Sequence, residues 1–133
     1  MSTETIEMPL PSLGVFKNLA SDEDIAHWLE ASLKECKSTY PMLQQSLSVA
    51  IDIGANVGGF CVYANQNFKK IYAFEPEQRN YFILSNVIKQ FNLTNVAAFN
   101  TAVYGQSSQT LALKKHAGSH SRDVSCATFG NIE

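Results

Sequence analysis

An apolar segment that runs directly into a glycine-rich turn constrains the fold of this chain more than any other feature. Residues 49–53 read Val-Ala-Ile-Asp-Ile, and residues 54–59 read Gly-Ala-Asn-Val-Gly-Gly. A second apolar segment, residues 71–74, ends at Glu75. A strand, a glycine turn, a helix and a second strand tipped with an acid predict half of a nucleotide-type binding site. The turn would let a ligand approach backbone N–H groups, and the acid could accept hydrogen bonds from both hydroxyls of a ribose.

The spacing within the turn excludes two common phosphate-binding patterns. A dinucleotide fingerprint needs a middle glycine where this chain has Asn56, whose side chain would crowd a pyrophosphate. A P-loop needs Lys-Ser or Lys-Thr after its last glycine, whereas Phe60 and Cys61 follow Gly59. A nicotinamide-dependent enzyme remains an alternative, with Asn56 as the contrary feature.

The remaining pattern is D-x-G-x-x-x-G, formed by Asp52, Gly54 and Gly58. A carboxylate beside this turn would repel a phosphate but suits a ligand that carries an ammonium group. S-adenosylmethionine has an ammonium group, a ribose and no phosphate, so it is the ligand that this pattern favours.

Four segments in register resemble the FkbM family of S-adenosylmethionine-dependent methyltransferases. They are residues 51–58 (IDIGANVG), 73–76 (AFEP), 95–96 (NV) and 102–103 (AV), within a match that covers roughly residues 47–113. The resemblance implies a Rossmann-like class I methyltransferase fold, an α/β fold with a mostly parallel seven-stranded sheet. It also implies methyl transfer, usually to a hydroxyl of a small molecule or sugar.

Candidate cofactor-binding residues lie in the turn or just beyond a strand. Asp52 is expected to bind the ammonium group, and Glu75 is expected to hold the ribose hydroxyls. Gly54 would allow close backbone approach, and Gly58 could let the helix start lie close to the strand. The full set is Asp52, Gly54, Ala55, Asn56, Gly58, Glu75, Pro76 and Thr101. The sequence identifies no catalytic base, and no metal site is expected.

Composition narrows the class of protein further. The chain has 133 residues, enough for one domain, and 10 basic against 12 acidic residues give a net charge of −2. Without a basic run, no nucleic-acid partner is expected. Cys36, Cys61 and Cys126 are too scattered for a disulfide framework or a zinc site, so Cys36 and Cys61 are predicted to pack as small apolar residues. No signal peptide or membrane span is apparent, which favours a cytoplasmic protein.

Periodicity predicts the order of elements along the chain. Residues 1–20 are expected to form an arm or loop, and residues 1–46 an N-terminal arm and helix before a partial methyltransferase domain at 47–133. The helix is expected to begin after a capping-box-like segment, Ser21-Asp22-Glu23-Asp24, and to end before Pro41. Strands are predicted at 48–53, 70–75, 96–100 and 110–113, helices from 57 and over 78–91, and irregular structure at 114–133, where His116 and His120 lie.

The resemblance implies further strands that do not precede Glu133, so the fold is expected to be truncated after the third or fourth strand. The first strand would then present an unpaired edge, which favours dimerisation or instability unless a missing C-terminal half is supplied elsewhere. Two hypotheses follow from a cofactor-binding half that lacks the further strands. The chain is a methyltransferase or its cofactor-binding portion, or it is a non-catalytic module that binds the cofactor or a partner chain.

Overall fold

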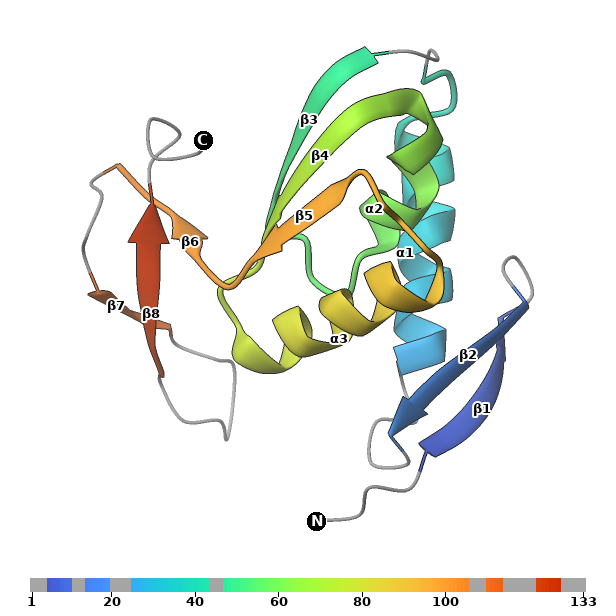
Figure 1. Cartoon of the computed structure of the whole chain (residues 1–133), viewed down its shortest axis with the longest axis horizontal. Coiled ribbons are helices and arrows are strands. Elements are labelled where there is room, and N and C mark those ends of the chain that lie inside the picture. The colour runs from blue at the N-terminus through green and yellow to red at the C-terminus, as the bar shows by residue number, and fades with distance from the viewer. Residues whose placement is uncertain are drawn as a thin grey trace.

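A three-stranded parallel sheet forms the centre of the protein, described here by a computed structural model (Figure 1). The structure describes residues 5–10, 14–19, 25–43, 47–105, 110–113 and 122–127. The sheet has the order β3 (Leu47–Ile53), β4 (Phe68–Phe74), β5 (Val96–Phe99). Its register places Ile53 beside Phe74 and Phe74 beside Phe99. The three strands therefore end level, and the residues that follow them meet at one edge.

Helices cover one face of this sheet. The chain passes from β3 to β4 through α2 (Gly59–Ala64) and the 3₁₀ turn η2 (Asn65–Asn67), and from β4 to β5 through α3 (Gln78–Gln90). Small and branched apolar residues of the sheet, of both helices and of the loops beside them form the core: Ala55, Cys61, Ala64, Ile71, Ala73, Leu84, Leu93 and Val96. These βαβ units confirm the predicted Rossmann-like α/β fold class.

The N-terminal segment is a strand pair, and the prediction of an arm or loop over residues 1–20 is wrong for residues 5–10 and 14–19. β1 (Thr5–Leu10) pairs antiparallel with β2 (Gly14–Leu19). Leu10 and Phe16 are buried, and Phe16 stacks on Phe91 with ring centroids 6.1 Å apart. The hairpin therefore contributes side chains to the core, and its prolines and glycine had obscured that role.

Helix α1 (Ile25–Thr39) joins the hairpin to the rest of the molecule. Its buried residues pack in one cluster with the hairpin, the glycine turn and α3: Leu10, Phe16, Ile25, Leu29, Leu33, Val57, Ile83 and Val87. The predicted helix ending before Pro41 is confirmed, while the capping segment at 21–24 lies outside the described residues.

A second small sheet follows β5. Its order is β6 (Ala102–Val103), β8 (Arg122–Ala127), β7 (Thr110–Leu113), and Figure 1 shows it on the side where β3, β4 and β5 end. The strand at 110–113 is confirmed, whereas the prediction of irregular structure over 114–133 is wrong for β8. His116 and His120 lie outside the described residues.

The sheet face opposite the helices carries apolar side chains that remain accessible. Val49, Ile51 and Ile53 of β3 are each about half exposed, and Phe99 of β5 is partly exposed. Within the described residues β3 pairs with β4 alone, so its other edge is unpaired. Among the described helices, none is long and apolar enough to cross a membrane.

Candidate functional site

The glycine turn folds back over the end of β4. Gly54, Asn56 and Gly58 all have positive φ, at 80°, 52° and 98°, so alternate residues of the turn adopt a conformation that L side chains rarely accept. The N–H groups of Gly54 and Ala55 both donate to the carbonyl oxygen of Phe74 at 2.9 Å. The end of one strand therefore anchors the turn that follows its neighbour.

The carboxylate of Glu75 ties the turn to the start of α3. Its Oε2 accepts from the backbone N–H of Asn56 at 2.7 Å, and its Oε1 accepts from the N–H of Glu77 at 2.8 Å. Glu77 in turn caps α3, because its Oε2 accepts from the N–H of Asn80 at 2.9 Å. Glu75 is only 5% exposed, so the structure gives it a bracing role that sequence reasoning did not predict.

The hydrogen bonds of the turn bear on which ligand it can hold. The N–H groups of Gly54, Ala55, Asn56 and Gly58 all donate to protein acceptors, the last to Ala55 O at 2.9 Å. These four donors are used within the protein, which leaves the turn fewer N–H groups for a phosphate than a P-loop offers. On its outer side the turn is open, since a Cβ atom added at Gly54 would meet no atom within 4 Å. A ligand can therefore approach the backbone of the turn at Gly54.

Gly58 faces a helix. A Cβ atom added there would lie 2.9 Å from Leu84 Cδ1 and 3.4 Å from Val87 Cγ1, both on α3. The sequence predicts that Gly58 lets the start of α2 lie close to the strand, whereas the neighbour that requires a glycine at this position is α3. This contact sets how closely the turn and α3 approach each other.

Asp52 points to the helix-covered side of the sheet. Its Oδ2 accepts a hydrogen bond from the thiol of Cys61, with the two atoms 3.6 Å apart. Burial raises the pKa of Asp52, and the nearby charge of Glu75 raises it further, while the Cys61 hydrogen bond opposes both. Asp52 also lines a cavity of about 190 Å³ with Cys36 and Tyr40 among others.

The two described cysteines pack as predicted. Cys36 and Cys61 are both buried, and burial raises the pKa of each thiol above its ordinary value. Protonated, buried thiols are poor nucleophiles and poor metal ligands, so these residues act as small packing groups and, at Cys61, as a hydrogen-bond donor.

The side chain of Asn100, which directly follows β5, joins the end of that strand to the same edge. Asn100 Nδ2 donates to the carbonyl oxygen of Glu75 at 2.9 Å and to that of Pro76 at 3.2 Å. Thr101, a candidate contact, follows directly and is half-buried. An amide side chain immediately after a parallel strand was the signal that could have identified this link.

A cavity of about 270 Å³ opens beside the turn. It is lined by Asn56 and Val57 of the turn, by Ile25 and Trp28 of α1, and by Arg79 and Asn80 of α3. Trp28, the single tryptophan of the chain, is 58% exposed there. Its indole therefore lies where binding at the turn can be followed by fluorescence.

No family model and no curated protein matches the chain. Solved structures to which it is similar include methyltransferase FkbM from Methylobacillus flagellatus KT, with 18% identity, a TM-score of 0.41, and coverage of 55% of this chain and 21% of that one. Precorrin-6y C5,15-methyltransferase from Geobacter metallireducens GS-15 has 21% identity and a TM-score of 0.40, and the match covers 56% of this chain and 37% of that one. YcgJ from Bacillus subtilis has 17% identity and a TM-score of 0.42, and the match covers 52% of this chain and 29% of that one. The chain thus spans well under half the length of these proteins.

Proposed function

We propose that this chain is an S-adenosylmethionine-dependent methyltransferase of the FkbM type, or the cofactor-binding portion of one, and that it methylates a hydroxyl group of a small molecule or glycan. One observation carries the cofactor assignment. The glycine turn after β3 and the acid after β4 are held together by the 2.7 Å hydrogen bond between Asn56 N and Glu75 Oε2. Ligands of open α/β sheets bind at this carboxyl edge of adjacent parallel strands.

The charges and hydrogen-bonding capacity of the turn support a cationic, ribose-containing ligand. A carboxylate has about four acceptor positions, and the two N–H donors on Glu75 leave about two for ribose hydroxyls. Because Glu75 is 5% exposed, ribose binding requires the groups that cover it to move. Burial disfavours ionised Asp52, and an ammonium group nearby would stabilise that ionised form.

When bound, S-adenosylmethionine supplies an electrophilic methyl group, and the contribution of this chain is to place the ligand. Gly54 leaves the outer side of the turn open to it, while Asn56 and Glu75 hold the turn in a fixed shape. Fixed placement of reacting groups accounts for much of the rate gain in transfers of this kind. No residue is assigned as the base that activates the acceptor hydroxyl.

The proposal is tested by titrating S-adenosylmethionine and NAD into the chain, followed by calorimetry and by Trp28 fluorescence. We expect saturable one-site binding of S-adenosylmethionine and weaker binding of NAD. Glu75→Gln should weaken the former by about tenfold or more, since hydrogen bonds to charged groups contribute about 1.5–3 kcal/mol. Glu7→Gln makes the same change on an exposed residue of β1 and should have no effect. Preferential binding of NAD, or no binding by a chain shown to be folded, would refute the assignment.

Methyl transfer separates an enzyme from a module that only binds the cofactor. Release of the demethylated cofactor in the presence of a panel of hydroxyl acceptors would identify an enzyme. Saturable binding with no turnover on any acceptor would favour the non-catalytic module, or a second chain that completes the protein.

A further inference from the structure

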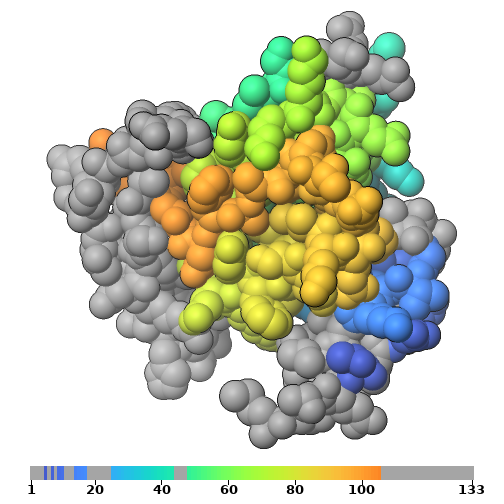
Figure 2. Space-filling view, viewed as in Figure 1, coloured from blue at the N-terminus to red at the C-terminus, as the bar shows by residue number. Residues whose placement is uncertain are grey.

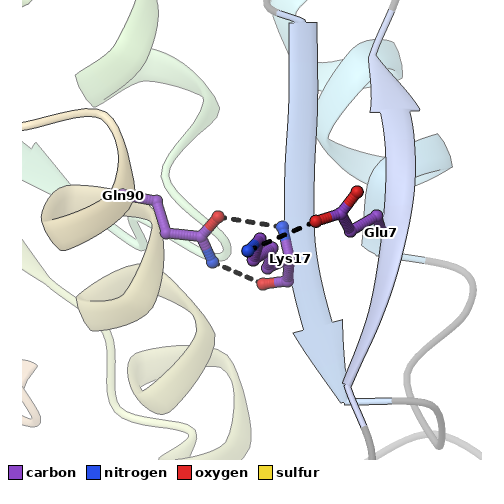
Figure 3. A network of polar contacts seen from close by, with 3 residues as sticks. All are labelled: Glu7, Lys17 and Gln90. Atoms are coloured by element: carbon purple, nitrogen blue, oxygen red, sulfur yellow. Dashed lines mark hydrogen bonds and ion pairs between the residues drawn. The ribbon is translucent and has the colours of Figure 1, made fainter.

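The β1–β2 hairpin is fastened to the outer face of α3 by side-chain amides. The N–H of Lys17 donates to Gln90 Oε1 at 2.9 Å, and Gln90 Nε2 donates to the carbonyl oxygen of Lys17 (Figure 3). Asn86 Nδ2 donates to the same carbonyl oxygen at 3.2 Å. These bonds satisfy the outward backbone groups of β2 at Lys17 and hold the hairpin and α3 in a fixed relation.

A cavity of about 690 Å³ lies at this junction, within the range of small-molecule sites. Figure 2 shows the surface of α3, in yellow, beside that of the hairpin, in blue. The cavity is lined from the hairpin by Thr5 and Lys17, and from α3 by Phe82, Ser85, Asn86, Lys89 and Gln90. The α3 residues are spaced i, i+3, i+4, i+7 and i+8, so they form one face of the helix. None of them belongs to the candidate cofactor site.

The lining offers an apolar surface that core packing does not explain. Phe82 is 65% exposed, while the buried face of α3 is formed by Ile83, Leu84 and Val87. The hydrocarbon stems of the two lysines that line the cavity add apolar area. A flat or extended hydrocarbon group could therefore be sheltered against this helix face.

Among the described residues that line the cavity, Lys89 is the one cation without an acidic partner. Lys17 Nζ lies 3.2 Å from Glu7 Oε1, so its charge is compensated within the hairpin. Within the described part of the chain, Lys89 makes no ion pair and no acidic residue lines the cavity. Lys89 also stands in the last turn of α3, where a cation complements the helix dipole, but its exposed ammonium group remains accessible to an anion.

Most other polar groups of the lining already have protein partners. The Ser85 hydroxyl donates to Tyr81 O at 2.9 Å, and the Gln90 amide is engaged by Lys17 and by Asn86 Oδ1. A ligand rich in hydroxyl groups would find few free partners here. A ligand with one anionic group and an apolar body would find one cation, Lys89, and one exposed apolar side chain, Phe82.

We propose that this cavity binds an amphiphilic monoanion, an aryl or alkyl carboxylate, with its apolar body on Phe82 and its carboxylate beside Lys89. The site is separate from the glycine turn, so it acts as a second ligand site of the protein. It does not depend on the methyltransferase proposal.

The test uses 2-naphthoate as the probe and neutral 2-naphthamide as its isostere, titrated into the whole chain by calorimetry. We expect saturable binding of 2-naphthoate and weaker binding of 2-naphthamide. Lys89→Gln should weaken 2-naphthoate binding by about threefold, as for an exposed charge pair, and leave 2-naphthamide unchanged. Phe82→Ala should weaken both. Lys70→Gln, which removes a lysine that lies over Tyr72 on β4, is the matched control and should change neither.

Amide chemical shifts of the wild-type chain locate the probe independently of any variant. Shifts confined to α3 residues 82–90 and to β2 support the proposal. Shifts on the exposed face of β3 and β5, equal affinity for the two probes, or no effect of Lys89→Gln would overturn it. Titration of S-adenosylmethionine into Phe82→Ala keeps the two proposals apart, because the cofactor site should be unaffected.

Discussion

The tightest packing contact around the glycine turn joins Gly59 to Ser32 of α1. Adding one methyl group at Gly59 should therefore destabilise the folded chain. A Cβ atom at Gly59 would lie 2.0 Å from Ser32 Oγ, 2.5 Å from Ser32 Cβ and 3.4 Å from Ser32 C. The first two distances are well inside van der Waals contact. Rotation of the Ser32 side chain could relieve the overlap with Oγ, whereas the overlap with Cβ is relieved only if α1 and α2 move apart.

The magnitude follows from two opposing effects. Overpacking in a well-packed core costs about 1–3 kcal/mol, and the direct overlap with a Cβ atom places this site at the upper end. Alanine is favoured over glycine in a helix by about 1 kcal/mol. We therefore expect Gly59→Ala to lower the free energy of unfolding by about 2 kcal/mol.

A double-mutant cycle measured by urea unfolding tests the assignment of that cost to Ser32. Ser32→Gly removes both close atoms, so Gly59→Ala in that background should be neutral or stabilising, with a coupling of about 2–3 kcal/mol. Ser32→Ala retains the Cβ atom at 2.5 Å and should give little relief, which makes it the matched control. A Gly59→Ala chain as stable as wild type, or an equal loss in the Ser32→Gly background, would refute the reasoning.

Three further predictions concern the turn, its acid and the exposed sheet face. Gly58→Ala should cost about 1–3 kcal/mol in urea unfolding, because φ is 98° and the new methyl group would lie 2.9 Å from Leu84 Cδ1; unchanged stability would contradict this. Because burial raises the pKa of Asp52, the folded chain holds that proton more tightly than the unfolded chain, and wild-type stability should fall as pH rises through the raised pKa. Asp52→Asn should therefore be more stable than wild type at neutral pH and lose that advantage in acid, as followed by thermal unfolding across pH; a constant difference would count against it. Self-association of the chain, measured by sedimentation, should weaken when Ile51 and Ile53 are replaced by threonine, and a monodisperse wild-type monomer would rule out the role assigned to the open edge and face of β3.

The elements of the parallel sheet could be predicted from the sequence because each is encoded by a local pattern. The apolar runs at 49–53 and 71–74, the helical period of 78–91 and the acid at Glu75 lie within short windows, and the structure has strands and a helix there. The paired strands at 5–10 and 14–19 were missed because their pairing, such as Glu7 with Lys17, is specified by contacts between strands and with α3. β8 was missed for a similar reason, since its partners β6 and β7 lie at a distance along the chain.

The sequence by itself determined which residues follow the strands, and therefore that the turn at 54–59 and Glu75 would share one edge of a parallel sheet. Only the tertiary structure decided what those residues do to one another. It placed Glu75 against the N–H of Asn56, directed Asp52 toward Cys61, and brought Gly59 against Ser32. Side-chain periodicity reports on neighbours a few residues apart, whereas these contacts depend on how whole helices pack across the sheet.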